Sequence, residues 1–349
     1  MPTQESVRGA SPFYEHSVSE IPGGSQALER LPLCPVCGGE EARPRYEIEA
    51  SAIRLFVCAD CGLGRLHPLP GLEELRDLYP DAYYGEPGSK FQPLAERLVR
   101  FVGERHISFL ARAHEPGSSV LDVGCGRGVL LGALADRGFE VHGVELSEDA
   151  VRGAEPRAQI RIAPSLVEAG YPAESFDLVV VWHVLEHLQN PREALEEVHR
   201  ILKPEGRLIV AVPNFSSLQA RWTRGAWFHL DLPRHLYHFP LDGLRRLSEK
   251  TGFEIESEHH FSLRQNPFGW VQSLLNLSSR WPRNGLYTLM HRRAAGVPQD
   301  MSFVARCELW LLAALLTPLG LAATLCETWL RSGATVHIVA RPVPGHSSR

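Results

Sequence analysis

A glycine-rich loop is the stretch of this sequence whose residue types could do chemistry most directly. Asp122 stands at the end of an apolar, β-branched run, and three glycines follow at alternate positions: Gly124, Gly126 and Gly128. Glycine tolerates positive φ and lets the backbone approach a ligand closely. Residues 129–134 then continue as an apolar helix, whose first N–H groups and partial positive charge attract a carboxylate. The pattern predicts a nucleotide-type cradle, with a plain tight strand-to-helix turn as the alternative.

The spacing of these glycines narrows the ligand class. D-x-G-x-G-x-G differs from the G-x-G-x-x-G of dinucleotide folds and from the phosphate loop, and the loop has no lysine to meet a phosphate. A dehydrogenase is therefore the least favoured interpretation. An acid ahead of the loop suits an ammonium group, as in the methionine part of S-adenosylmethionine. Glu145 ends the next expected strand and is placed to accept both ribose hydroxyls, unless it is a simple exposed acid.

Two cysteine pairs form a second candidate site with the form C-x2-C-x20-C-x2-C. Four thiolates at this spacing suit a tetrahedral Zn²⁺, and a filled coordination shell predicts a structural metal rather than a catalytic one. A redox or incidental cluster is the alternative. Residues 31–70 hold four arginines against five acids, so RNA binding by this ribbon is the minority interpretation. The predicted ligands are Cys34, Cys37, Cys58 and Cys61.

Composition sets the broad class. The 349 residues are 44% hydrophobic and 22% charged with a net charge of −5, which is ordinary for a globular protein and unlike a nucleic-acid-binding surface. The seven cysteines do not form a disulfide framework, and the first residues lack the pattern of a signal peptide. We therefore expect a cytoplasmic protein. Residues 1–30 should be a mobile tail, and 71–115 a helical linker or lid whose tyrosines, Tyr79, Tyr83 and Tyr84, either cap the glycine loop or pack in the linker.

Apolar strand-like segments alternate with helices through the rest of the chain, which predicts a doubly wound parallel sheet of the α/β class. Ligands bind such sheets at the carboxyl ends of the strands, where the glycine loop, Glu145, Ser165 and 183–187 all fall. The expected strands cover 120–123, 139–146, 160–166, 175–182, 206–214, 253–257 and 333–341.

The region 118–262 resembles class I S-adenosylmethionine-dependent methyltransferases. Its sequence motifs follow one another in the same order as in that family, at 122–128, 175–177, 185–187 and 202–206. The cysteine ribbon ahead of it resembles the subset with an N-terminal zinc domain, which includes sugar C-methyltransferases. The resemblance implies a Rossmann-like core over 116–262 and 333–342. Many members carry an acid at the adenine position, where this chain has Ser165 and Leu166. The implied donor-binding residues are Asp122, Gly124, Gly126, Gly128, Glu145, Leu146, Ser165, Leu166 and His183.

A segment dense in histidine and aromatic residues, 227–239, is expected on the acceptor side. His187, His235 and Tyr237 are candidates for taking a proton from the acceptor, and packing roles are the alternative. We expect methyl transfer from S-adenosylmethionine to an O, N or C nucleophile of a small-molecule, sugar or glycan, or lipid-linked acceptor. Two alternatives stay open: an RNA methyltransferase guided by the ribbon, and a non-catalytic S-adenosylmethionine-binding scaffold.

An insert over 263–332 separates the last two expected strands. Five arginines face one acid between 280 and 306, and 309–326 runs without a charge. Pro318 and Gly320 interrupt this stretch, so we expect two apolar helices that form a cap or a homodimer surface. The second interpretation is contact with a membrane surface at the inner face, helped by the basic flank.

Overall fold

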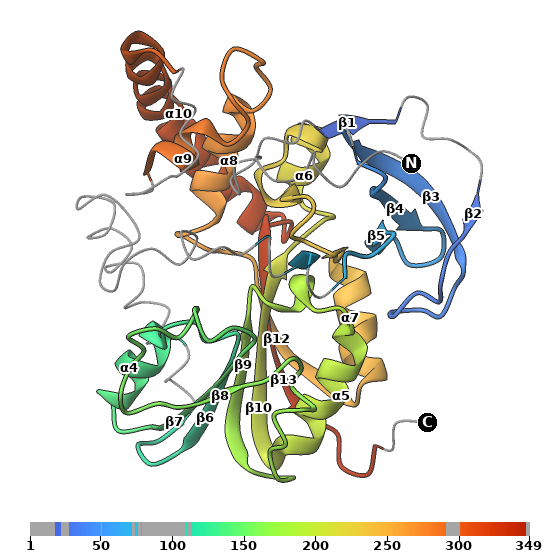
Figure 1. The fold of residues 1–349 in the computed structure, drawn as a ribbon, viewed down its shortest axis with the longest axis vertical. Helices are drawn as coiled ribbons and strands as arrows, with labels where there is room; N and C mark the ends of the chain where they lie inside the picture. The colour runs from blue at the N-terminus through green and yellow to red at the C-terminus, as the bar shows by residue number, and fades with distance from the viewer. Residues whose placement is uncertain are drawn as a thin grey trace.

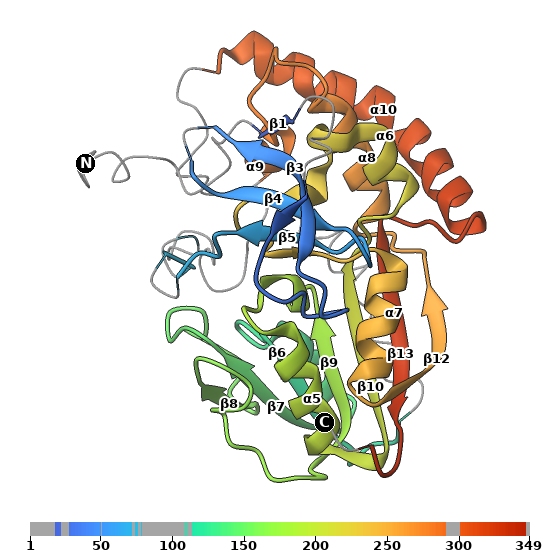
Figure 2. The ribbon, with the colours of Figure 1, turned by 90° about the vertical axis from the view of Figure 1, so that its right-hand side faces the viewer.

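The structure is a computed structural model. It contains a large core sheet, a smaller sheet built around the cysteine ribbon, and a group of helices (Figure 1). The ribbon sheet and these helices lie together at one end of the core sheet, where β10 leads into α6 (Figures 1 and 2). The residues that the structure describes are 18–21, 28–49, 51–71, 74–75, 78, 109, 114–290 and 301–346.

The core sheet has seven strands in the order β12-β13-β10-β9-β6-β7-β8. Strands β6 to β10 pair in parallel, and β13 pairs antiparallel with both β10 and β12. This topology confirms the expected doubly wound α/β fold, to which β13 adds an antiparallel strand. The strands are β6 (Ser119–Val123), β7 (Glu140–Glu145), β8 (Gln159–Ile162), β9 (Phe176–Trp182), β10 (Leu202–Pro213), β12 (Phe253–His259) and β13 (Thr335–Pro342).

Helices cover both sides of this sheet, which is why its central strands are rich in buried apolar residues. α5 (Pro191–Ile201) and α7 (Leu241–Lys250) lie along one face, and α4 (Val129–Ala135) lies on the other (Figures 1 and 2). Every residue of β6 is buried. α7 ends just before Gly252, whose φ of +86° suits glycine at a helix C-terminus.

The ribbon sheet extends beyond the strands that carry or flank the cysteine pairs. Around β3 (Glu41–Ile48), β4 (Arg54–Cys58) and β5 (Gly64–His67) it adds β1 (Val18–Glu20) and β2 (Glu29–Arg30), which both pair with β3. The expectation of a mobile tail over 1–30 is therefore wrong for these two strands. An ion pair of 2.8 Å between Glu20 and Arg45 helps to hold β1 against β3.

The ribbon sheet also takes a strand from the acceptor segment. β11 (Tyr237–His238) pairs antiparallel with β5, through Tyr237 with Arg65 and His238 with Gly64. The N–H of Leu66 donates to the carbonyl of Leu236 at 3.0 Å. The cysteine ribbon therefore supports the segment that was expected to face the acceptor. The expected linker or lid over 71–115, with its tyrosines, lies almost wholly outside the described residues.

The insert forms three helices, α8 (Asn266–Leu275), α9 (Gly285–Met290) and α10 (Phe303–Trp329), next to α6 (Leu218–Thr223). The expectation of two helices over 309–326 is wrong, because α10 runs unbroken through Pro318. Proline removes one helical bond, to the carbonyl of Ala314, and both residues lie on the exposed side of the helix. A small apolar cluster joins the helices: Val271, Leu275, Leu286, Met301, Leu309 and Ala313.

Only a narrow stripe of α10 packs against the protein. Gly320 lies on it, and a Cβ there would be 3.0 Å from the carbonyl of Pro267, so glycine allows α8 to approach closely. The opposite face is exposed and, over 309–326, uncharged, and in length and composition α10 resembles a membrane-spanning helix. Its exposed large side chains include Trp310, Leu311, Leu315, Leu319, Leu325 and Trp329.

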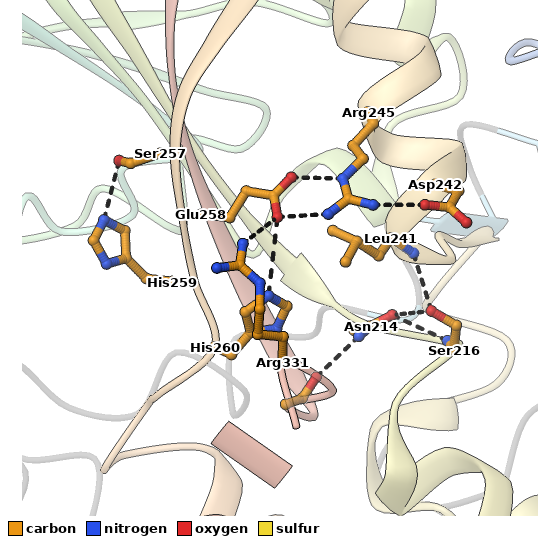
Figure 3. Close-up of polar contacts among 11 residues, drawn as sticks. Asn214, Ser216, Leu241, Asp242, Arg245, Ser257, Glu258, His259, His260 and Arg331 are labelled. Carbon is orange, nitrogen blue, oxygen red and sulfur yellow. Dashed lines mark hydrogen bonds and ion pairs between the residues drawn. The ribbon is translucent and has the colours of Figure 1, made fainter. Parts of the chain in front are cut away.

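The C-terminal end of α10 is fixed to the core by an ion-pair network (Figure 3). Glu258 on β12 accepts two bonds from Arg245 of α7, at 2.6 and 2.7 Å, and one from Arg331 at 3.1 Å. These bonds, the Arg245 pair first, hold the pKa of Glu258 below its usual value. The network therefore ties the chain just after α10 to β12 and α7.

Candidate functional site

The glycine loop joins β6 to α4 at the carboxyl end of the core sheet. Its three glycines all have positive φ, +70° at Gly124, +51° at Gly126 and +69° at Gly128. A Cβ at Gly124 would lie 2.6 Å from Val184 Cγ2, so this glycine is needed for packing. Among the described residues, no atom would lie within 4 Å of a Cβ at Gly126. The loop is therefore a cradle with open space above Gly126.

Two carboxylates face this cradle. Asp122, near the end of β6, is buried, and burial first and the Glu145 charge second raise its pKa to about 8. Glu145, at the end of β7, accepts hydrogen bonds from the N–H of Gly126 at 2.9 Å and of Leu146 at 2.8 Å. A buried carboxyl beside a second acid gains most from a bound cation. The pair fits the ammonium end and the ribose of S-adenosylmethionine.

The residues expected near adenine lie beyond β8. The hydroxyl of Ser165 accepts from the N–H of Glu168 at 3.2 Å and donates to its carboxylate at 3.1 Å, while Leu166 is buried. The Ser165 hydroxyl therefore stabilises the turn over residues 165–168 through its two bonds to Glu168. The N–H of Ala163 donates to the carbonyl of Glu145 at 2.9 Å, which keeps this turn next to the glycine cradle.

A cluster of histidine and acid side chains lies at the carboxyl end of β9. His183 has a φ of +54°, and its Nδ1 lies 3.3 Å from Oε1 of Glu186, on the short 3-10 helix η1 (Leu185–His187). A carboxylate only accepts, so Nδ1 of His183 carries the hydrogen. Burial lowers the pKa of His183 to about 3 and raises that of Glu186 to about 7. His183 therefore belongs to this cluster as well as to the neighbourhood of the donor loop.

The structure brings His187 and His235 together. Their ring centroids are 4.7 Å apart. Nδ1 of His187 donates to the carbonyl of Arg234 at 3.0 Å, and Nδ1 of His235 donates to the carbonyl of His229 at 2.9 Å. Nε2 of His235 also lies 3.7 Å from Oδ2 of Asp231. Burial holds the pKa of His235 well below its usual value.

Tyr237 lies apart from this pair. Its hydroxyl donates to the carbonyl of Gln189 at 3.0 Å, and burial raises its pKa to about 12. That bond gives Tyr237 a positioning role for the turn before α5.

The histidines of the 227–239 segment are mostly neutral. Burial lowers the pKa of His229 to about 3 and that of His238 to about 4. A general base works best with a pKa near the working pH, so such rings are weak proton acceptors. Neutral imidazoles with fixed tautomers are, in contrast, well suited to bind a metal ion or to orient a ligand.

The four ribbon cysteines converge as expected. Their sulfur atoms all lie within 4.8 Å of one another, with Cys34 Sγ 3.6 Å from Cys61 Sγ and Cys37 Sγ 3.5 Å from Cys58 Sγ. Zinc–sulfur bonds of about 2.3 Å in a tetrahedron give sulfur separations of about 3.8 Å. A hydrogen bond from Cys61 lowers the pKa of the Cys34 thiol to about 5. The cluster fits a structural Zn²⁺.

Sequence reasoning did not assign a role to Glu186, His229 or Asp231. Glu186 is 1% exposed, and its burial between two leucines of the 185–188 phrase was the available signal. An acid followed by histidine inside an apolar phrase is unusual, because buried acids need a partner.

Comparison with known proteins agrees with this geometry. A family model described as a methyltransferase domain matches residues 94–258. A ubiquinone biosynthesis O-methyltransferase of Thiobacillus denitrificans is 33% identical over 206 residues, which cover 54% of this chain and 84% of that protein.

Two further relatives match a shorter stretch. A ubiquinone biosynthesis O-methyltransferase of Hahella chejuensis is 33% identical, with 36% of this chain and 54% of the relative covered. A probable S-adenosylmethionine-dependent methyltransferase of Mycolicibacterium smegmatis is 34% identical, with 40% and 53% covered. The chain thus spans about half the length of these two relatives. Together with the sheet order and the glycine cradle, the matches show that the chain belongs to the class I S-adenosylmethionine-dependent methyltransferases.

Proposed function

We propose that this protein transfers a methyl group from S-adenosylmethionine to an oxygen atom of a small organic acceptor. The observation that carries this proposal is the open space above Gly126, bordered by Asp122 and Glu145. The histidine cluster stands at the same end of the sheet, so a donor in the cradle and an acceptor at the cluster would be neighbours.

The residues of the cradle and of the histidine cluster have separate tasks in this proposal. S-adenosylmethionine supplies a methyl group on a sulfonium, which is a good leaving centre. Asp122 holds the ammonium end, and the Glu145 carboxylate exchanges its bond to Gly126 for the ribose hydroxyls. The cluster around Glu186 and His235 orients the acceptor. The protein then contributes mainly alignment of the two reacting groups.

Oxygen is favoured over nitrogen and carbon because relatives at about 33% identity are named O-methyltransferases. The exposed apolar face of α10 supports a lipid-linked acceptor over a sugar or glycan. The arginine excess between 280 and 306 suits an anionic lipid surface, where we place the protein as a peripheral cytoplasmic enzyme. A homodimer through α10 is the competing arrangement.

We further propose that the ribbon binds Zn²⁺ through its four cysteines and that this zinc is structural. The converging sulfur atoms support the assignment, and four thiolates leave no coordination position for a substrate.

A labelled-donor screen tests the function. The protein is incubated with methyl-labelled S-adenosylmethionine and lipid, sugar-nucleotide or RNA fractions of the host. Label in a lipid hydroxyl supports the proposal. Label in RNA favours the ribbon-guided alternative, and donor binding without any label favours the non-catalytic scaffold.

Calorimetry with the donor tests the site itself. We expect Glu145→Ala to weaken donor binding by at least about tenfold, because it removes a charge-assisted acceptor. Glu148→Ala, an exposed acid three residues later, is the matched control and should bind like the wild type. Equal affinity of the wild type and Glu145→Ala would contradict the assignment of the cradle.

A further inference from the structure

We propose that Glu186, His187 and His235 form a binding site for a first-row divalent metal ion, separate from the cysteine ribbon. Each of the three side chains offers one ligand atom, and these atoms all lie within 4.8 Å of one another. One carboxylate and two imidazoles is a common donor set for Mn²⁺, Fe²⁺, Co²⁺ and Zn²⁺.

The first independent observation is the state of the Glu186 carboxylate. The side chain is 1% exposed. Oε1 receives Nδ1–H of His183 at 3.3 Å, while Oε2 has no hydrogen-bond partner among the described residues. A buried carboxylate oxygen without a partner is costly, and a cation is the partner that compensates most. His183 would then fix the orientation of the Glu186 carboxylate through its hydrogen bond to Oε1.

The second observation is the orientation of the two imidazoles. Nδ1 of His187 meets the carbonyl of Arg234, and Nδ1 of His235 meets the carbonyl of His229, at 3.0 and 2.9 Å. Because a carbonyl only accepts, Nδ1 carries the hydrogen in both rings and Nε2 carries the lone pair. Metal-binding histidines are typically held by such a bond from their other nitrogen.

The backbone joins the two segments that supply the ligands. Glu186 and His187 follow β9, whereas His235 comes from the segment beyond the 3-10 helix η3 (Phe228–Leu230). The N–H of Leu236 donates to the carbonyl of Glu186 at 2.9 Å, which fixes His235 next to the acid. The ligands are therefore positioned before any ion arrives, so ordering them costs little on binding.

The surroundings leave a negative charge to balance. Asp231 lies 3.7 Å from Nε2 of His235, and its charge is paired with Arg234 at 2.8 Å. Glu186 has no cationic partner of this kind in the described part of the chain. Three protein ligands also leave coordination positions open, as catalytic sites do and the four-cysteine ribbon does not.

The role of the ion rests on the proposed function. An ion held by these residues would lower the pKa of an acceptor hydroxyl bound at an open position, so the hydroxyl would lose its proton to solvent more readily. Its oxygen then forms a bond to the methyl carbon while the sulfur–carbon bond breaks, and the sulfonium becomes a neutral thioether.

Binding of Mn²⁺ to the full-length protein tests the site, followed by the loss of the free-ion signal in electron paramagnetic resonance. Mn²⁺ prefers oxygen and nitrogen ligands, so the thiolate ribbon does not compete. We expect one Mn²⁺ per chain in the wild type and at least tenfold weaker binding in Glu186→Gln and in His235→Gln. His199→Gln, on α5 and away from the cluster, is the control and should bind like the wild type.

A cobalt titration of the wild type keeps the test independent of how the variants fold. Co²⁺ in the ribbon gives sulfur-to-metal charge-transfer absorption, and a second Co²⁺ without that absorption would support the site. Absence of any Mn²⁺ or second Co²⁺, or unchanged binding in folded Glu186→Gln and His235→Gln, would overturn it. Neither measurement needs an acceptor: ion binding without methyl transfer would reject the proposed function alone, and methyl transfer by a protein that binds no Mn²⁺ would reject the site alone.

Discussion

Asp122 is the residue whose ionisation is most strongly set by its surroundings in the donor cradle. Its pKa of about 8 means that the donor-free protein carries a proton on Asp122 at neutral pH. A bound ammonium group favours the carboxylate, so donor binding releases that proton. We expect donor affinity to rise between pH 6 and pH 8, by up to about tenfold per pH unit. Calorimetry in buffers of different ionisation enthalpy measures both the affinity and the proton release.

Asp122→Asn provides the contrast, because it should bind the donor weakly and without this pH dependence. The raised pKa also means that folding is more stable at low pH, and that this stability is lost progressively as the pH rises from the ordinary Asp value of 3.8 to about 8. The variant should lack that loss. A wild-type affinity that stays flat between pH 6 and pH 8 would show that Asp122 does not pair with the ammonium group.

Two glycines of the loop should respond differently to alanine. At Gly126 a methyl group enters the open space and the φ of +51° is strained, so we expect donor binding to fall at least tenfold and stability by about 1 kcal/mol. At Gly124 the methyl group collides with Val184, and the loss of stability should be larger. Thermal unfolding and donor titration of both variants separate the two roles. Equal donor affinity of Gly126→Ala and the wild type would place the ligand elsewhere.

At the residue scale, sequence reasoning works where ligand-holding residues are neighbours in the chain. The cradle needs a strand, a turn and a helix in succession, and Asp122 and the glycines carry that signal locally. Glu186 and His235 meet only because the 227–239 segment folds back over the end of β9. No local sequence pattern predicts the contact between Glu186 and His235, so the sequence indicates only separate histidines.

At the scale of elements, the ribbon and the acceptor segment should respond together. Cys58→Ser removes one of the four thiolates, and loss of the metal should loosen β5 and the β11 strand paired with it. We expect faster amide hydrogen exchange in peptides covering 63–67 and 236–239. Peptides from β6 in the core sheet should keep their wild-type protection.

Cys307→Ser is the matched control, because Cys307 is exposed on α10 and outside the ribbon. It should leave both exchange rates unchanged. Rapid exchange at 63–67 with full protection at 236–239 would show that β11 stays in place without its partner strand.

Elements with long apolar repeats were the predictable ones. The core strands and α5 bury whole faces, so the spacing of their apolar residues predicts them. β1, β2 and β11 have two or three residues each and gain stability from a neighbour across the sheet, so their own sequences carry little signal. α10 was divided in the sequence interpretation because of Pro318, whose lost bond falls on the exposed side.

For the molecule as a whole, α10 divides into a stabilising and a non-stabilising side. Leu309 is 1% exposed and Leu311 is 62% exposed. We expect Leu309→Ala to cost about 2–5 kcal/mol in the free energy of unfolding and Leu311→Ala less than about 0.5 kcal/mol. Denaturant unfolding in the presence of a mild detergent, which covers the apolar face, measures both.

The exposed apolar face of α10 should determine whether the protein binds vesicles or forms a dimer. Leu315→Gln combined with Leu319→Gln should reduce binding to anionic vesicles in a flotation assay while leaving the unfolding curve unchanged. A variant that still floats but no longer dimerises in sedimentation would assign the face to a second copy of the chain.

The position of β13 has a consequence for synthesis of the chain. β13 follows β12 and the whole helical insert in sequence, yet it lies between β12 and β10 in the sheet, with Leu208 opposite Ala340. While the ribosome is still making the insert, β10 presents an unpaired edge and β12 has no neighbour. The apolar α10 emerges during this interval. A nascent chain paused before residue 335 should therefore be a preferred client of chaperones, and release of the last strand should end that dependence.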